Sequence, residues 1–138
     1  MPITTFDHYT VRSADLDASR RFYEQALGLH VIDRPVPNGR AARVQIGETD
    51  VVHIFQATPE MEAIFARMPS RETLEGWNTG RIHHVEFWAA GLPETRDRLN
   101  RAGVSFSEAT LPDKHQLRLT DPDGIGVNLN FPLSEAGQ

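Results

Sequence analysis

Three histidines lie in strand-like segments of this 138-residue sequence, and their side chains have the chemistry of metal ligands. They are His8, His53 and His84. Neutral imidazole binds Zn, Ni, Mn, Co or Fe(II), and a set of three leaves positions open for a substrate. A single histidine on a strand is more often a packing or surface residue, so the metal interpretation depends on all three acting together. The chain has no cysteine, which restricts a metal site to histidine, carboxylate and amide ligands.

The histidines belong to two halves of the chain that repeat each other. The matching pairs are His8 with His84, Leu16 with Leu92, and His53 with Asn128. The first two pairs are 76 residues apart and the third is 75 apart, which indicates one residue fewer in the helix of the second half. The sequence therefore predicts one domain over 1–138, with module one at about 4–56, a connector at 57–80 and module two at about 81–132.

Each module predicts a strand, a helix and three further strands. The strands are expected at 7–12, 30–34, 41–47 and 50–56, and near 82–89, 104–108, 115–120 and 125–131. Asp15 and Gly28 mark the ends of the first helix, whereas Pro93 and Gly103 mark those of the second. The fold class is α+β, with two tandem βαβββ modules that form a curved mixed sheet around a cavity.

The connector carries Met61, Ile64, Phe65 and Met68 at helical spacing. This spacing predicts a short amphipathic helix, which either packs on the domain or covers the pocket as a lid.

Strand alternation selects the side chains that face the cavity. Besides the histidines and Asn128, this face carries the predicted substrate-binding residues Thr10, Arg43, Phe55, Trp88, Gln116, Arg118 and Asn130. The arginines present a planar fork to carboxylate or phosphate, unless they are solvated charges on a strand face. Trp88 and Phe55 are suited to stacking on an apolar or aromatic ligand. Glu86 is the candidate acid or base, and the alternative role for it is an ion pair with one of the arginines.

Composition excludes several classes of partner. The net charge is −5 and basic residues form no long run, which argues against nucleic acid as a partner. No apolar stretch approaches the length of a membrane span, and the first residues lack the features of a signal peptide. Together with the absence of cysteine, these features predict a cytoplasmic protein with a small-molecule ligand.

These motifs resemble the vicinal oxygen chelate superfamily, which includes glyoxalase I, fosfomycin-resistance enzymes, extradiol dioxygenases and bleomycin-resistance proteins. The matching stretches are 7–11, 15–19, 22–23, 27–29, 84–87 and 121–124 leading to Asn128, and the resemblance covers nearly the whole chain. It implies metal ligands at His8, His53, His84 and Asn128. The last is a departure, because the family usually has Glu there, and Asn is a poorer ligand that cannot act as a base. A three-histidine site is also more positive than the family's usual site, which favours anionic ligands.

Three functions follow from this resemblance. The leading one is a metal-dependent enzyme that acts on a small oxygenated, anionic substrate by isomerase or lyase chemistry, with a divalent metal as Lewis acid and Glu86 as proton shuttle. The alternative is a non-catalytic protein that binds an antibiotic-type small molecule and confers resistance. The third is an extradiol-type dioxygenase, which requires Glu86 as the carboxylate of a facial triad. The resemblance also implies a homodimer, with the site either within one chain or across two.

Overall fold

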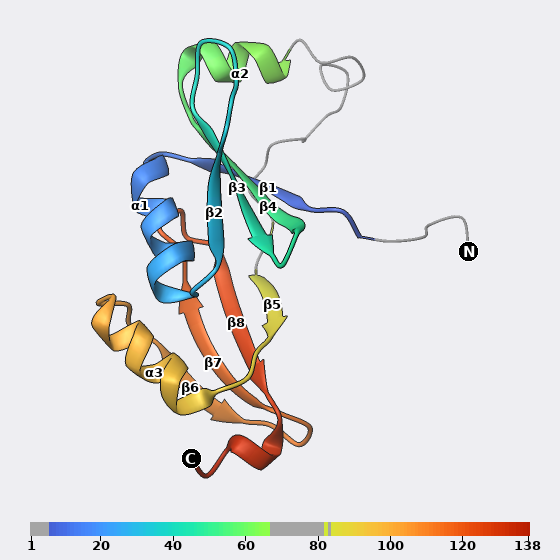
Figure 1. The fold of residues 1–138 in the computed structure, drawn as a ribbon, viewed down its shortest axis with the longest axis vertical. Helices are drawn as coiled ribbons and strands as arrows, with labels where there is room; N and C mark the ends of the chain where they lie inside the picture. Colours follow the sequence, from blue (N-terminus) through green and yellow to red (C-terminus); the bar gives the residue numbers. More distant parts are fainter. Residues whose placement is uncertain (1–5, 67–81, 83) are drawn as a thin grey trace, which may run out of the picture.

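Two modules with the same order of elements make up the fold (Figure 1). The computed structural model describes residues 6–66, 82 and 84–138. Module one contains β1 (Tyr9–Ser13), α1 (Leu16–Arg21), the π-helical segment η1 (Phe22–Ala26), β2 (His30–Arg34), β3 (Ala41–Ile46) and β4 (Thr49–Gln56). Module two contains β5 (His84–Trp88), α3 (Leu92–Arg101), β6 (Ser107–Thr110), β7 (His115–Thr120) and β8 (Gly126–Phe131). The helix α2 (Pro59–Ala66) follows module one, and the 3₁₀ turn η2 (Leu133–Glu135) follows module two. This order confirms the predicted tandem βαβββ fold.

Each module forms one four-stranded mixed sheet. The strand orders are β1-β4-β3-β2 and β5-β8-β7-β6. In both sheets the first strand pairs in parallel with the last, and the other pairs are antiparallel. Because the first and last strands of a module are neighbours, residues far apart in sequence lie side by side. Thr10 is opposite His53, and Glu86 is opposite Asn128.

One strand differs from its predicted position. The expected strand at 104–108 is observed at Ser107–Thr110. Val104 and Phe106 pack against the hydrophobic core before the strand begins. Their alternation with serine imitates a strand, although no neighbouring strand pairs with this segment.

The helix ends have the caps that the sequence predicts. The Asp15 carboxylate accepts a hydrogen bond from the Ala18 amide at 3.0 Å, which satisfies an otherwise free donor of the first turn. Gly28 and Gly103 follow the two helices with φ of 70° and 69°, a left-handed conformation that glycine adopts without strain.

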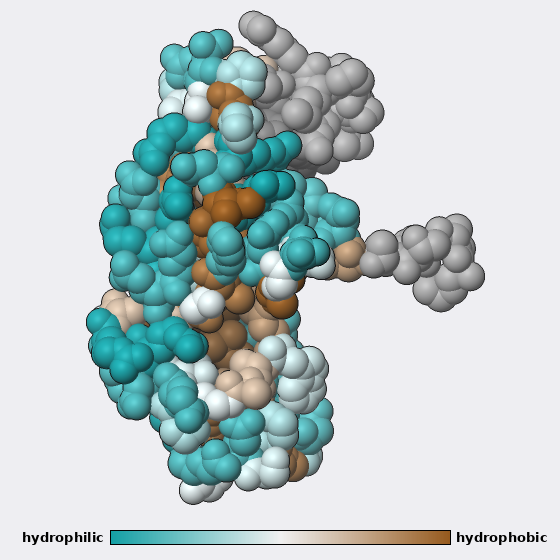
Figure 2. Space-filling view, in the orientation of Figure 1, coloured by the Kyte–Doolittle hydropathy of each residue, from teal (hydrophilic) through white to brown (hydrophobic). Residues whose placement is uncertain are grey.

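One hydrophobic core joins the two modules. Figure 1 shows α1 and α3 on the same side of the two sheets, and their buried residues belong to one cluster with the inner faces of the strands. In the space-filling view, apolar side chains gather along the middle of the molecule, where the modules meet (Figure 2). Tyr23 of η1 is fully buried at this junction, and its hydroxyl lies 3.2 Å from a carboxylate oxygen of Asp121 in module two. Asp123 accepts hydrogen bonds from Ser19 Oγ and the Ala14 amide across the same junction.

The helix α2 packs on module one away from this core. Met61 is 2% exposed and forms a separate cluster with Ala41, Phe55 and Val36. Glu62 of the same helix lies 2.7 Å from Arg12 Nε. These contacts agree with the packing role expected for the connector helix, although Met68 lies outside the described residues. Within the described part of the chain, no helix has the length and apolar character needed to cross a membrane.

Candidate functional site

Each sheet has one face covered by a helix of its own module and a second face, called here the open face. The open face of module one brings two of the predicted metal ligands together. The ring of His8 stacks on that of His53, with centroids 3.6 Å apart and an angle of 27° between the planes. Thr10 and Arg43 flank His53 on the two neighbouring strands. The four side chains therefore share one surface, as strand alternation predicts.

Hydrogen bonds on both ring nitrogens hold His53 in one form. Its Nε2 lies 3.2 Å from Asp50 Oδ2, and its Nδ1 lies 3.2 Å from Arg34 Nη1. Since a guanidinium only donates, Nδ1 must accept and Nε2 must carry the proton that Asp50 accepts. Burial lowers the pKa of His53 below its ordinary value, despite the opposing hydrogen bond to Asp50. His53 is therefore a neutral imidazole at pH 7.

Arg43 has an unsatisfied donor on the same face. Its side chain is 38% exposed, with Nη1 3.6 Å from Asp50 Oδ2. Its Nε, by contrast, is buried and has no hydrogen-bond partner among residues 6–66, 82 and 84–138. A buried donor without an acceptor is costly, so a group that accepts from this atom would be stabilised there.

The open face of module two centres on Glu86, whose carboxylate accepts four hydrogen bonds. Oε1 accepts from Asn128 Nδ2 and Gln116 Nε2, both at 3.2 Å. Oε2 accepts from Asn130 Nδ2 at 3.0 Å and from Lys114 Nζ at 3.3 Å. Hydrogen bonds from Asn130 and Asn128, with a smaller contribution from Lys114, lower the pKa of Glu86 to about 2. The carboxylate is therefore ionised at pH 7 and is a weak proton acceptor.

The remaining predicted residues of module two surround this carboxylate. His84 Nε2 lies 3.6 Å from Glu86 Oε1, and Trp88, two residues along β5, is 67% exposed. Arg118 Nε donates to Gln116 Oε1 at 2.6 Å. Gln116 and Asn130 are 2% and 3% exposed, whereas the Glu86 side chain is 35% exposed, so buried amides hold a carboxylate that water still reaches.

A divalent metal needs several ligand side chains that converge on one point. Among the described residues, no three His, Asp or Glu side chains lie close enough together to hold one ion. The candidate ligands also have other partners, because His8 Nδ1 contacts the Asp7 carboxylate, and both His53 nitrogens and both Glu86 oxygens are hydrogen-bonded. Asn128 donates its amide to Glu86. As arranged in the described part of one chain, these residues do not fit a metal centre.

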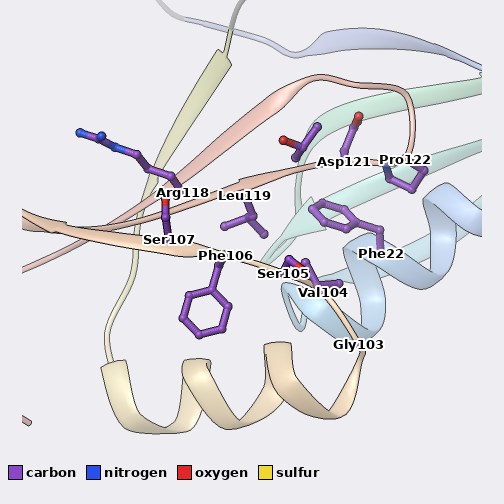
Figure 3. A pocket seen from close by; sticks show the side chains of 11 residues that line it. Phe22, Gly103, Val104, Ser105, Phe106, Ser107, Arg118, Leu119, Asp121 and Pro122 are labelled. Carbon is purple, nitrogen blue, oxygen red and sulfur yellow. The ribbon is translucent and has the colours of Figure 1, made fainter.

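Two clefts lie next to the helices of module one. One, of about 550 Å³, is bounded by η1, β7 and the segment that leads into β6. Figure 3 shows Phe22, Phe106 and Leu119 gathered there, whereas the Arg118 side chain points away. The other, of about 720 Å³, lies between α1 and the β2–β3 hairpin. It is lined by Arg34 and Ala41, so it adjoins the cluster around His53.

Three residues of the site were not predicted from the sequence. Arg34 and Lys114 lie on the same strand face as the predicted residues. Pairing of β2 with β3 would have identified Arg34, and extension of β7 by one residue would have identified Lys114. Asp50 has the opposite parity to His53, yet it bonds His53 and Gln45. An irregularity in the β3–β4 register at Val44 and Gln45 accounts for this, and simple alternation does not reveal it.

Two tandem βαβββ modules with polar open faces define a glyoxalase-like protein. The model of the Glyoxalase/Bleomycin resistance protein/Dioxygenase superfamily matches residues 5–129, and the chain belongs to this superfamily. The search of curated proteins found no match.

Solved structures share the fold at low sequence identity. A lactoylglutathione lyase from Agrobacterium tumefaciens is 18% identical with a TM-score of 0.66, over 95% of this chain and 96% of that one. An antibiotic-binding protein from a Streptomyces species is 22% identical with a TM-score of 0.65, over 96% and 98%. A glyoxylase/bleomycin resistance protein/dioxygenase domain from a Frankia species is 17% identical with a TM-score of 0.67, over 96% and 95%. These similarities show the fold, and they include both an enzyme and a binding protein.

Proposed function

We propose that this protein binds a small oxygenated anion on the open face of module one and acts as a ligand-binding member of its superfamily. The buried Nε of Arg43, which lacks an acceptor, carries this proposal. A carboxylate or another oxyanion is the group that best satisfies a guanidinium donor in a half-buried place. The structural similarity to an antibiotic-binding protein is consistent with a role in sequestering such a molecule.

Neighbouring side chains support an anion rather than a cation. Arg34 lies beside His53, which makes this patch rich in donors. The nearby carboxylate of Asp50 already accepts from His53 and Gln45. Ala41 and Phe55 form an apolar patch next to these donors, and Met61 packs over it. The ligand is therefore expected to combine an oxyanion with a flat or apolar portion.

A pair of probes that differ in charge tests this proposal. Benzoate and benzylammonium have the same ring and opposite charge, and calorimetry is expected to detect binding of benzoate alone. Arg43→Lys keeps the charge but removes Nε, and it should weaken benzoate binding at least tenfold. The matched control, Arg21→Lys, lies exposed on α1 and should change affinity less than twofold. Tighter binding of benzylammonium, or an unaffected Arg43→Lys protein, would refute the proposal.

A metal-dependent lyase or isomerase is the second candidate. Two contacts favour it. The stacked pair His8 and His53 consists of two predicted ligands, and His84, a predicted ligand, lies near Glu86, the candidate acid or base. Metal analysis after equilibration with Zn, Ni, Mn, Co or Fe(II) tests this candidate. About one equivalent per site, lost in His8→Ala/His84→Ala, would support it, and no retained metal would exclude these histidines as ligands. No observation favours the dioxygenase over these two.

The homodimer remains a prediction. The strands β1 and β5 are at sheet edges, where each can pair with another chain. Sedimentation equilibrium measures the mass directly, and repeating the metal analysis on a separated monomer would show whether ligands come from two chains.

A further inference from the structure

Each module has an arginine at an equivalent position, but the hydrogen bonding of the arginine Nε differs between the two modules. Arg43 and Arg118 are 75 residues apart, and each pairs with the equivalent residue of the last strand, His53 or Asn128. Arg118 Nε donates to Gln116 Oε1 at 2.6 Å. Arg43 Nε is buried without an acceptor.

The residue two positions earlier on the strand explains this difference. Gln116 precedes Arg118 on β7, and its counterpart before Arg43 on β3 is Ala41, which has no acceptor in its side chain. Across the ladder, Gln116 pairs with Asn130, whereas Ala41 pairs with Phe55. Module two thus supplies an internal acceptor for its arginine, and module one has an apolar pair at the same place.

The acceptor in module two is held firmly. Gln116 Nε2 donates to Asn130 Oδ1 at 2.9 Å and to Glu86 Oε1 at 3.2 Å, which turns Oε1 of Gln116 toward Arg118. Through this relay, Glu86 orients an arginine that it does not touch. In the described part of the chain no such relay reaches Arg43 Nε, because the position equivalent to Glu86 is Thr10.

We infer that an oxygen of the bound ligand takes the place beside Arg43 Nε that Gln116 Oε1 takes beside Arg118, so that module one is the ligand-receiving half and module two is satisfied internally. The inference rests on the proposed function and narrows it to one donor atom. The ligand oxygen belongs to a carboxylate or another oxyanion. The apolar part of the ligand lies over Ala41 and Phe55, in the place that Met61 covers.

Met61 has to move for a ligand to reach this position. It is 2% exposed and packs on Ala41 and Phe55. Its unbranched side chain has three rotatable bonds, so it can yield without displacement of the helix α2. The cleft between α1 and the β2–β3 hairpin is lined by Ala41, on which Met61 packs, so this cleft borders the position that Met61 covers.

The substitution Ala41→Gln tests the inference, because it gives module one the acceptor of module two. In nitrogen-15 spectra of arginine side chains, the Arg43 Nε proton should become protected from solvent exchange at least tenfold. Benzoate affinity should fall at least tenfold, since the new amide occupies the site of the ligand oxygen. The control Thr49→Gln adds the same side chain at an exposed position of β4 and should change neither quantity. The reverse substitution, Gln116→Ala, should remove protection from Arg118 Nε.

The outcomes separate this inference from the proposed function. If benzoate affinity falls in Arg43→Lys but not in Ala41→Gln with a protected Nε, the ligand oxygen lies elsewhere and the inference is overturned while the function stands. If the native protein binds no benzoate, the proposed function fails. The spectra of Ala41→Gln and Gln116→Ala still show whether glutamine at position 41 accepts from Arg43 Nε as Gln116 accepts from Arg118 Nε. Should Ala41→Gln fail to fold, Ala41→Gln/Met61→Ala removes the crowding thioether, and an unprotected Arg43 Nε in that protein would overturn the inference.

Discussion

The open faces of the two modules share one backbone plan and differ in how their polar groups are satisfied. In module two, buried amides surround the Glu86 carboxylate and leave it fully hydrogen-bonded. In module one, two of the three equivalent positions are apolar, α2 covers these two, and an arginine donor has no partner among the described residues. The equivalent pairs are Thr10 with Glu86, Ala41 with Gln116, and Phe55 with Asn130. A repeated fold therefore preserves strand register more strictly than it preserves the chemistry on its strands.

The largest effect is expected from removing the carboxylate of module two. Glu86→Ala removes the acceptor of the buried Asn130 amide and one of the two acceptors of the Gln116 amide, which should reduce the free energy of unfolding by about 3 kcal/mol. Urea denaturation measures this change. The equivalent substitution in module one, Thr10→Ala, is at an exposed position and should cost less than about 0.5 kcal/mol. Equal losses in the free energy of unfolding for Glu86→Ala and Thr10→Ala would contradict the proposed difference between the two modules.

A smaller loss is expected from Met61→Ala, which acts on module one alone. The substitution uncovers Ala41 and Phe55 and should lower the free energy of unfolding by about 2 kcal/mol. Because it also opens the position beside Arg43, benzoate should bind more tightly. Parallel denaturation and calorimetry check both results. A loss of stability with weaker benzoate binding would show that Met61 supports the ligand and does not cover its site.

The acid dependence of stability should report on module two. The folded pKa of Glu86 is about 2, below its ordinary value of 4.5. The carboxylate therefore contributes stability that is present above about pH 4.5 and is lost as the pH falls toward 2. Glu86→Gln should make stability less dependent on pH in this window, as measured by denaturation at pH 2 to 5.

The junction carboxylate Asp121 acts with the opposite sign. Burial raises the pKa of Asp121 above its ordinary value, so its contribution is present at low pH and is lost as the pH rises through the folded pKa. A Glu86→Gln protein whose acid dependence matches the native one would mean that other carboxylates with a lowered pKa, such as Asp50 and Glu108, control this range.

The smallest effects are expected at a pair of exposed equivalents. Arg12 forms an ion pair with Glu62 of α2, whereas its counterpart Trp88 is 67% exposed. Substitution of either by alanine should change the free energy of unfolding by about 0.5 kcal/mol or less. Tryptophan fluorescence of a Trp77→Phe variant, in which Trp88 is the remaining tryptophan, then gives a test of ligand contact, because a ligand confined to module one should leave the emission of Trp88 unchanged.

Repetition made the fold predictable from the sequence. The strands β2 and β7 have their predicted bounds. Asp15 caps the start of the first helix and Gly28 follows its end, as expected. Alternation and capping depend on neighbouring residues, so a single sequence contains them. The prediction of a strand at 104–106 was wrong because apolar side chains can alternate and reach the core without a strand partner.

The candidate site was only partly predictable for a related reason. Parity identified which face each side chain takes, and Glu86, Gln116 and Arg118 do share a face. Parity does not reveal which donor finds which acceptor. The low pKa of Glu86 and the unsatisfied Nε of Arg43 depend on contacts between strands, and these exist only after the register and side-chain geometry are set.

The π-helical segment η1 explains how the two copies came to differ in length without losing their correspondence. Equivalent residues are 76 apart at the helix starts, Leu16 and Leu92, and 75 apart at the glycines that follow, Gly28 and Gly103. The additional residue of module one thus lies between these points, where Phe22–Ala26 adopts the wider turn that accommodates one insertion. If the two halves descend from one duplicated ancestor, an insertion or deletion occurred in this helix and was absorbed within a single turn. The strands on either side kept their pairing, which left each copy free to diverge by point substitution alone.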